Sequence, residues 1–214
     1  MATEIVVAAP YQLRRAVPTD AEAVCDVVAA LDLAVAGDAE RYAPEDIISD
    51  LEGIDGETSA WVVTAPDGAV VAYATATNYG SGQLSADGYV HPAHWGHGIG
   101  TALVRLTEAR AREFLPAAPE GVQVTLGCGI HLSDEAARGI LEREGFALAR
   151  VHWTMRIDLE AAPPAPEWPA GVSLRTFVPG RDERAVFDCV DEAFSDHWGH
   201  TPGDFAQWIK RVER

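Results

Sequence analysis

The sequence has few cysteines, few basic residues and no long apolar run, and each scarcity argues against a class of protein. Its three cysteines, Cys25, Cys128 and Cys189, lie far apart and form no C-x-x-C pair. This number and spacing argue against a disulfide framework and a zinc site, and they indicate free thiols in a reducing cytosol. No stretch approaches the ~18 consecutive apolar residues that a membrane span requires. Residues 1–13 lack the basic region of a signal peptide, so we expect a cytoplasmic protein with no membrane partner.

Basic residues are also scarce relative to acidic ones. The chain of 214 residues has 16 Lys and Arg against 33 Asp and Glu, for a formal net charge of −17. An acidic surface repels nucleic-acid phosphates, so no nucleic-acid partner is expected. The same charge favours a cationic small molecule such as an amine, although it is as often only a solubility trait.

Hydrophobic periodicity predicts a mixed α/β domain over residues 1–159. The expected elements, in chain order, are a strand at 11–17, helices starting at Thr19 and Pro44, two strands joined by a turn at Pro66-Asp67-Gly68, a strand ending at Val90, a helix from Ile99 to Phe114, a strand within 121–129, a helix from Ser133 to Gly145 and two strand-like runs within 146–159.

Residues 160–170, EAAPPAPEWPA, form a proline-rich linker, and the sequence after it repeats the beginning of the chain. VSLRTFVPGRDERAV at 172–186 matches YQLRRAVPTDAEAV at 11–24, with one extra residue before the helical pattern resumes. The match predicts that residues 171–214, a strand followed by helices, begin a second module like the first. A coincidental likeness is the alternative. Because so short a segment is unlikely to bury a core, we expect it to belong to a longer two-module protein, to dock elsewhere or to join two copies as a homodimer.

The segment HPAHWGHGIGTALVRL at residues 91–106 carries the main functional signal. Gly96, Gly98 and Gly100 alternate between a predicted strand and a predicted helix. At a helix N-terminus, free backbone N–H groups and the helix dipole favour an anion, and glycines let a phosphate approach the backbone. The spacing matches neither the dinucleotide-binding G-x-G-x-x-G motif nor a P-loop, and a glycine-rich turn is often only structural.

In its context the loop resembles the acyl-CoA loop of the GNAT acyltransferase superfamily. In that family a strand ends in Val-x-Pro. After it comes a six-residue motif: Arg or Gln, then Gly, any residue, Gly, Ile or Leu, and Gly. The matching segments here are Val90-His91-Pro92 and Gly96-His97-Gly98-Ile99-Gly100. The order of predicted elements over residues 11–159 is also similar to that fold. The internal repeat and FSDHWGHTP at 194–202 resemble tandem, two-module actinobacterial members of the mycothiol synthase type.

The resemblance implies a mostly antiparallel, splayed sheet flanked by helices, with acetyl-CoA or another acyl-CoA bound where two strands separate. It implies acyl transfer to a small amine without a metal. The residues it assigns to the acyl-CoA are Val90, His91, Trp95, Gly96, His97, Gly98, Ile99, Gly100 and Thr101. The backbone at Val90 would bond the pantetheine arm or the thioester, and the amides from Gly96 to Thr101 would hold the pyrophosphate. His91, His94 and His97 lack an identifiable group to orient them, so we interpret them as surface residues rather than metal ligands.

Two positions depart from the family pattern. Trp95 replaces the usual Arg or Gln, and the loss of a charge-assisted bond predicts acyl-CoA binding weaker by ~1.5–3 kcal/mol, unless Trp95 simply packs on the sheet. Leu141 stands where members often have a tyrosine that protonates the departing thiolate, and leucine cannot donate a proton. Asp87 and His131 are then the candidate acid–base residues. The alternative is that both are solvent-exposed side chains with no catalytic role.

These departures leave two further functions open beside an active N-acetyltransferase. One is a catalytically degenerate acyl-CoA-binding or structural module, whose active partner copy lies in a missing C-terminal half. The other is an interaction domain with no affinity for CoA. The acceptor itself cannot be named from the sequence, but helices at 20–53 would shape its pocket, and the acidic residues there are Asp38, Glu40, Glu45 and Asp46.

Overall fold

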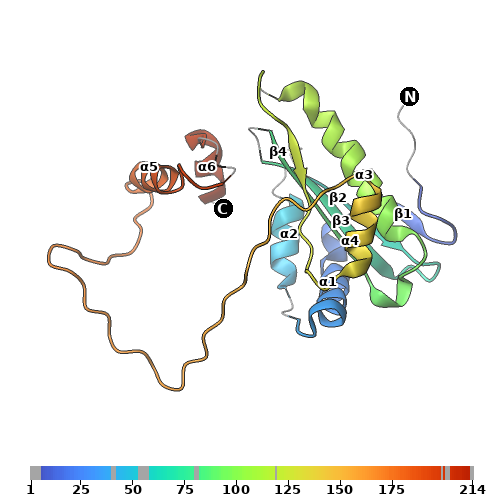
Figure 1. The fold of residues 1–214 in the computed structure, drawn as a ribbon, viewed down its shortest axis with the longest axis horizontal. Coiled ribbons are helices and arrows are strands. Elements are labelled where there is room, and N and C mark those ends of the chain that lie inside the picture. The colour runs from blue at the N-terminus through green and yellow to red at the C-terminus, as the bar shows by residue number, and fades with distance from the viewer. Residues whose placement is uncertain are drawn as a thin grey trace. The chain divides into compact units, whose positions relative to one another are not determined.

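The structure is a computed structural model that describes residues 6–39, 42–52, 58–79, 82–118, 120–198, 200 and 203–212. The chain divides into two compact units, Met1–Val151 and His152–Arg214. Figure 1 shows the sheet and the helices α1–α4 of the first unit, and the helices α5 and α6 of the second.

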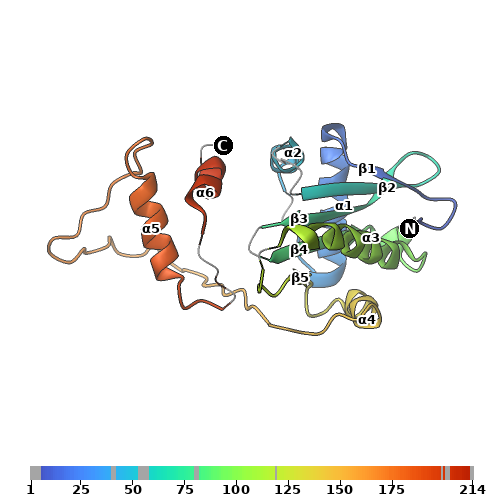
Figure 2. The same cartoon turned by 90° about the horizontal axis from the view of Figure 1, so that it is seen from above.

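The first unit is built on a five-stranded sheet in the order β1-β2-β3-β4-β5 (Figure 2). Its strands are β1 (Gln12–Arg15), β2 (Thr58–Thr64), β3 (Val70–Asn78), β4 (Gln83–Val90) and β5 (Thr125–Gly127). The first four strands pair antiparallel, and β4 pairs with β5 in parallel. The predicted hairpin is confirmed: Gly68 has a φ of 88°, and the Asp67 carboxylate accepts a hydrogen bond from the Ala69 N–H at 3.0 Å.

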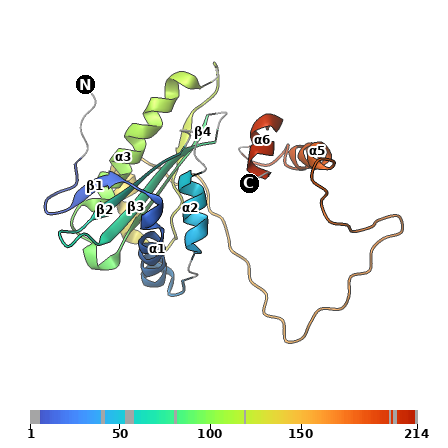
Figure 3. The same cartoon turned by 180° about the vertical axis from the view of Figure 1, so that it is seen from behind.

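Helices cover both faces of this sheet, and Figure 3 shows the side on which α1 and α2 lie. The helices of the first unit are α1 (Ala21–Ala36), α2 (Pro44–Glu52), α3 (Ile99–Phe114) and α4 (Glu135–Arg143), with 3-10 turns at Pro18–Asp20, Pro92–His94 and Leu115–Ala117. Successive strand residues point to opposite faces, so Val62 packs with α1 whereas Val63 packs with α3. Both valines are fully buried. The core therefore consists of two apolar clusters, one on each face of the sheet.

Two helices begin later in the sequence than predicted. Helix α1 begins at Ala21 with Asp20 at its N-cap, not at Thr19. Helix α4 is capped by Asp134, whose carboxylate accepts the Ala137 N–H at 2.8 Å. Ser133, which was predicted as this cap, lies one residue earlier, and its hydroxyl donates to the carbonyl of Val35 at 2.6 Å, a contact 98 residues away in sequence.

The strand predictions after α3 were partly wrong. Only Thr125–Gly127 of the run within 121–129 forms a strand, and residues 146–159 and 172–178 form none. An alternating apolar pattern makes a strand only when a neighbouring strand accepts its backbone hydrogen bonds. None of the five described strands pairs with residues 146–159, and large apolar side chains there stay exposed, as in Trp153 (80%) and Met155 (92%).

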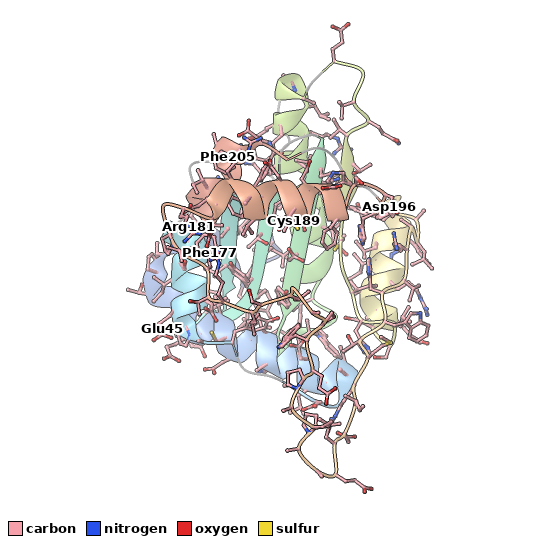
Figure 4. The ribbon with its side chains drawn as sticks, turned by 90° about the vertical axis from the view of Figure 1, so that its left-hand side faces the viewer. Glu45, Phe177, Arg181, Cys189, Asp196 and Phe205 are labelled. Atoms are coloured by element: carbon pink, nitrogen blue, oxygen red, sulfur yellow. The ribbon has the colours of Figure 1, made fainter. Side chains whose placement is uncertain are left out.

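The second unit contains α5 (Glu183–Ala193) and α6 (Phe205–Val212). Phe187 on α5 is buried, and its ring meets those of Phe205 and Trp208 with centroids 5.3 and 5.7 Å apart. Figure 4 shows Phe205 beside α5, Arg181 before that helix, Asp196 after it and Cys189 on it. This unit is therefore held together by a small aromatic cluster.

The two repeated segments share one local arrangement of hydrogen bonds. Arg14 donates to both carboxylate oxygens of Asp20 at 2.7 Å, and the Val17 N–H donates to the same carboxylate at 2.9 Å. In the second unit, Arg175 donates to both oxygens of Asp182, and the Val178 N–H donates at 2.8 Å. The extra residue found in the sequence lies between the arginine and the aspartate of the second copy.

Candidate active site

A cavity of about 350 Å³ opens where β4 and the chain after β5 separate. The pairing of the two strands ends at Ser85 and Gly127. Beyond that point Asp87, Gly88 and Val90 of β4 line the cavity, and so do Cys128 and Ile130 after β5. Residues of α1, the glycine loop, α3 and α4 complete its lining. The splayed sheet predicted from the sequence is thus present, and its opening is the cavity.

The glycine loop forms one part of this lining, and its glycines have different physical roles. Gly96 and Gly98 have φ angles of 80° and 76°, a region that disfavours side chains, and a Cβ added at either would meet nothing within 4 Å. A Cβ on Gly100 would lie 3.1 Å from the Ile140 side chain of α4. The close packing of α4 therefore favours glycine at this position. Gly98 is the N-cap of α3, and as a glycine it offers no side chain to cap the N–H groups of the first turn.

Trp95 makes a contact that the sequence did not predict. Its indole Nε1 donates to the carbonyl of Val90 at 2.9 Å, while the side chain stays 44% exposed at the cavity. The Val90 carbonyl is therefore already bonded within the protein. Of the nine residues predicted to bind acyl-CoA, the structure places seven in the lining: Val90, Trp95, Gly96, Gly98, Ile99, Gly100 and Thr101.

The other two predicted residues, His91 and His97, do not line the cavity. His91 accepts the Ala93 N–H at 3.2 Å, and the His97 ring lies against Tyr11 with centroids 5.6 Å apart. His94 does line the cavity, and its Nδ1 is hydrogen-bonded to the Tyr11 hydroxyl at 3.0 Å. Within the described residues, no three His, Cys, Asp or Glu side chains are arranged to hold a metal ion.

A second cavity, of about 300 Å³, lies between the sheet and the helices α1 and α2, and Asp87 lines both cavities. The Asp87 carboxylate is half-buried, and the hydroxyls of Ser85 and Thr75 are 3.4 and 3.5 Å away. Burial raises the pKa of Asp87, which these hydroxyls only partly oppose. Of the acidic residues expected at an acceptor pocket, Asp46 lines this cavity, Asp38 and Glu45 do not, and Glu40 lies outside the described residues.

Three lining residues of the first cavity bear on proton transfer and charge. Burial and the nearby Asp87 charge raise the pKa of Cys128 to about 11, so its thiol keeps its proton at neutral pH. Leu141, at the position of the family tyrosine, is buried in the lining. Arg143 of α4 adds a cationic side chain. The sequence did not indicate Cys128 or Arg143, although Cys128 belongs to the strand predicted within 121–129.

His131 is placed away from both cavities. It is exposed, its Nδ1 lies 2.6 Å from the Ser133 hydroxyl, and it is absent from the lining of either cavity. Its charge instead acts on Asp32 of α1, where it opposes the rise in pKa that burial causes. Of the two predicted acid–base residues, only Asp87 therefore has a position beside the cavities.

The sheet order, the splay and the glycine loop agree with a known family. Residues 28–146 match the model of the Acetyltransferase (GNAT) family. The chain belongs to the GNAT acetyltransferase family. The GNAT fold predicted from the sequence is thereby confirmed. No helix within the described residues of this GNAT chain combines the length and apolarity needed to cross a membrane.

Curated relatives of this GNAT chain include proteins named mycothiol acetyltransferase. The one from Frankia casuarinae is 38% identical over 144 residues, which cover 66% of this chain and 39% of that protein. The one from Thermobispora bispora is 33% identical over 186 residues, which cover 86% of this chain and 57% of that protein. The chain thus spans about half the length of the curated relatives it matches.

Solved structures give the same family. A GCN5-related N-acetyltransferase from Sphaerobacter thermophilus is 39% identical, with a TM-score of 0.79 over 97% of this GNAT chain and 64% of that chain. A phosphinothricin acetyltransferase from Sinorhizobium meliloti, solved in complex with acetyl-CoA, is 19% identical, with a TM-score of 0.52 over 65% of this chain and 76% of that one. At this identity the second comparison supports the fold alone.

Proposed function

We propose that the first unit binds acetyl-CoA in the 350 Å³ cavity and transfers the acetyl group to a small amine in the adjoining 300 Å³ cavity. The observation that carries the proposal is Asp87, which lines both cavities. A carboxylate in that position reaches the acceptor from one side and the acyl donor from the other.

The residues of the first cavity suit an acyl-CoA. The first-turn N–H groups of α3, from Ile99 to Thr101, have no intrahelical acceptor and would hold the pyrophosphate together with the backbone at Gly96 and Gly98. Arg143 adds a positive charge to the same lining. The apolar walls offered by Ile130 and Ile140 suit the pantetheine arm. A cavity of about this volume lies within the usual range for small-molecule sites.

The groups beside the cavities support direct transfer. An ammonium must lose a proton before its nitrogen attacks the thioester carbonyl, and Asp87 is placed to take that proton. Its raised pKa brings this base closer to neutral pH. As the C–N bond forms and the C–S bond breaks, the departing thiolate needs a proton, which Leu141 cannot give. Cys128 holds a proton in the same lining and would supply it, and the proton that Asp87 took from the amine would return to the Cys128 thiolate.

A module that binds acyl-CoA without turnover is the second candidate. Two observations favour it: Leu141 fills the tyrosine position, and Trp95 occupies the Val90 carbonyl with its indole N–H. In that case the acetyl transfer of the whole protein takes place in a second module. The Arg175–Asp182 arrangement, which repeats that of Arg14 and Asp20, supports our proposal that residues 171–214 begin such a module.

For the whole protein we propose acetylation of a small-molecule acceptor, which is the activity in the name of its mycothiol acetyltransferase relatives. A cytoplasmic location, and docking or dimerisation through residues 171–214, stay predictions.

The test is a calorimetric titration of the full chain with acetyl-CoA. We expect saturable binding, and a Kd at least tenfold weaker in Gly98→Leu because the new side chain enters the open space at the loop. Gly68→Leu is the matched control: Gly68 has a similar φ of 88° and open surroundings, but it lies in the β2–β3 turn. It should bind acetyl-CoA like the wild type.

Release of the CoA thiol in the presence of amines then separates the two candidates. Release establishes an active acetyltransferase, whereas binding without release identifies the non-catalytic module. A wild-type chain that shows neither heat nor a thermal shift with acetyl-CoA would rule out both.

A further inference from the structure

The second cavity has an unusual lining for its size. Eight residues form it, three of them tyrosines and two aspartates: Val28, Tyr42, Asp46, Ile47, Tyr73, Thr75, Asp87 and Tyr89. No Lys, Arg or His occurs among these described lining residues. The cavity is therefore aromatic and negatively charged at the same time, without a cation of its own.

Two of the tyrosines form a rigid aromatic wall. Tyr73 on β3 and Tyr89 on β4 are directly paired across the two strands. Their rings stack with centroids 6.3 Å apart and an angle of 20° between their planes. Tyr73 is buried, at 4% exposure, so this wall is held by the sheet. Tyr42, in the segment before α2, is 51% exposed and adds a third ring at the solvent side.

Carboxylates from three elements lie in or near the second cavity: Asp46 and Asp87 line it, whereas Asp32 does not. Asp46 lies in the first turn of α2, Asp87 on β4 and Asp32 on α1. Burial raises the pKa of Tyr89, and the negative field of neighbours that include Asp87, Tyr42 and Asp32 raises it further. Among the described residues, His131 opposes this field at Asp32, whose pKa is raised by burial and lowered by His131. A neutral or anionic ligand gains nothing from such a field.

We propose that this second cavity is a binding site for a compact organic cation, held by the faces of the tyrosine rings and by the carboxylates of Asp46 and Asp87. Ring faces attract cations through the quadrupole of their π-systems, and carboxylates add a direct charge attraction. The proposal rests on the acetyltransferase function above and names its acceptor class: a small ammonium compound without a carboxylate of its own. An amino acid would place its carboxylate among Asp46 and Asp87 and is excluded.

The experiment separates charge from shape with two probes of nearly equal form. Choline carries a quaternary ammonium, and 3,3-dimethylbutan-1-ol replaces the nitrogen with carbon and is neutral. Each is titrated into the full chain, without acetyl-CoA, and binding is followed by saturation-transfer NMR. We expect choline to bind at least tenfold more tightly than the alcohol, and glycine to show no binding.

Tyr42→Ala tests the aromatic contribution without disturbing the core, since Tyr42 is half-exposed. Tyr79→Ala is its matched control, because Tyr79 is also 51% exposed but lies outside the cavity. We expect Tyr42→Ala and Asp46→Asn to weaken choline binding at least fivefold, and Tyr79→Ala to leave it unchanged. Tyr89→Phe, which keeps the ring, should bind choline like the wild type.

Equal binding of choline and the alcohol, or equal behaviour of the two alanine variants, would overturn the cation site. Because the probes need no acetyl-CoA, this outcome differs from a failure of the proposed function. Choline binding in a chain that ignores acetyl-CoA would confirm the site and remove the transferase role. Acetyl-CoA binding in a chain that binds choline and the alcohol equally would support the acetyl-CoA site and overturn the cation site.

Discussion

Asp87 lines both cavities, and in the proposed reaction its protonation state decides whether it can take a proton from the amine. Burial favours the neutral carboxylic acid, whereas catalysis of amine acetylation needs the carboxylate. Because its pKa is raised in the folded protein, folded molecules bind this proton more tightly than unfolded ones. Its contribution to the free energy of unfolding therefore falls as the pH rises from the ordinary value of 3.8 through the raised pKa.

Asp87→Asn should separate stability from activity. We expect the rate of amine acetylation to fall by about 10²–10⁴-fold, since a positioned base is lost. The melting temperature at pH 7 should rise, because a half-buried charge has been removed. The wild-type rate should decrease as the pH falls through the raised pKa of Asp87, and this acidic limb should disappear in the variant. The measurements are CoA-thiol release and thermal unfolding over a pH series.

Asp38→Asn is the control for this experiment, because Asp38 is exposed and lines neither cavity. It should change neither the rate nor the melting temperature. An Asp87→Asn variant that turns over amines at the wild-type rate would show that another group takes the proton.

At the scale of elements, the connection from β1 to α1 depends on one ion pair. Asp20 stands at the N-cap of α1, is 6% exposed, and accepts two hydrogen bonds from Arg14 and one from the Val17 N–H. Its carboxylate thus ties the end of a strand to the start of a helix. The Arg14 guanidinium holds the pKa of Asp20 below its usual value.

Asp20→Ala should lower the free energy of unfolding of the first unit by about 1.5–3 kcal/mol, because it removes charge-assisted hydrogen bonds and leaves Arg14 without its partner. The pKa of Asp20 is lowered on folding, so this contribution is present above the ordinary value of 3.8 and is lost as the pH falls through the folded value. Urea unfolding at pH 7 and at pH 3 measures both effects.

Glu135→Ala is a suitable comparison in the same unit. Glu135 pairs with Arg138 at 3.7 Å, and both side chains are largely exposed. Loss of such a surface pair should cost less than about 0.5 kcal/mol. If both variants lose the same amount, the buried pair contributes no more than a surface one.

At the scale of the whole molecule, every residue that lines the two cavities lies between Val28 and Arg143, inside the first unit. The second unit begins at His152, and residues 146–170 contain neither helix nor strand. Arg156 in this stretch is exposed, and its ion pair with Asp158 is exposed as well. The machinery proposed for acetyl-CoA is therefore confined to one unit of the chain.

Limited trypsin digestion should exploit this division. We expect early cleavage after Arg156 and a stable fragment that binds acetyl-CoA within threefold of the intact chain. Mass spectrometry identifies the cut, and calorimetry on the purified fragment measures the affinity. Arg156→Gln should slow this cut alone. A fragment that unfolds or loses acetyl-CoA would show that residues beyond the cut support the cavity.

Much of the fold was predictable because it follows from local patterns. The hairpin at Asp67 and Gly68, the helix after Gly98 and the apolar stripe of α1 all depend on residues close together in sequence. Most of the lining residues named from the sequence belong to one continuous loop, and Asp87, Asp46 and Leu141 are the others. Sequence reasoning therefore found most of the residues from Val90 to Thr101 but missed Cys128 and Arg143.

The sequence by itself determined the order of most helices and strands and the glycine loop, since each is a property of neighbouring residues. Only the tertiary structure decided which residues meet. It placed Asp87 in both cavities, turned Trp95 onto the Val90 carbonyl, and left His131 outside. It also left the alternating pattern of residues 146–159 without a strand. Strand pairing and cavity walls join residues far apart in the chain, and hydrophobic periodicity carries no information about such distances.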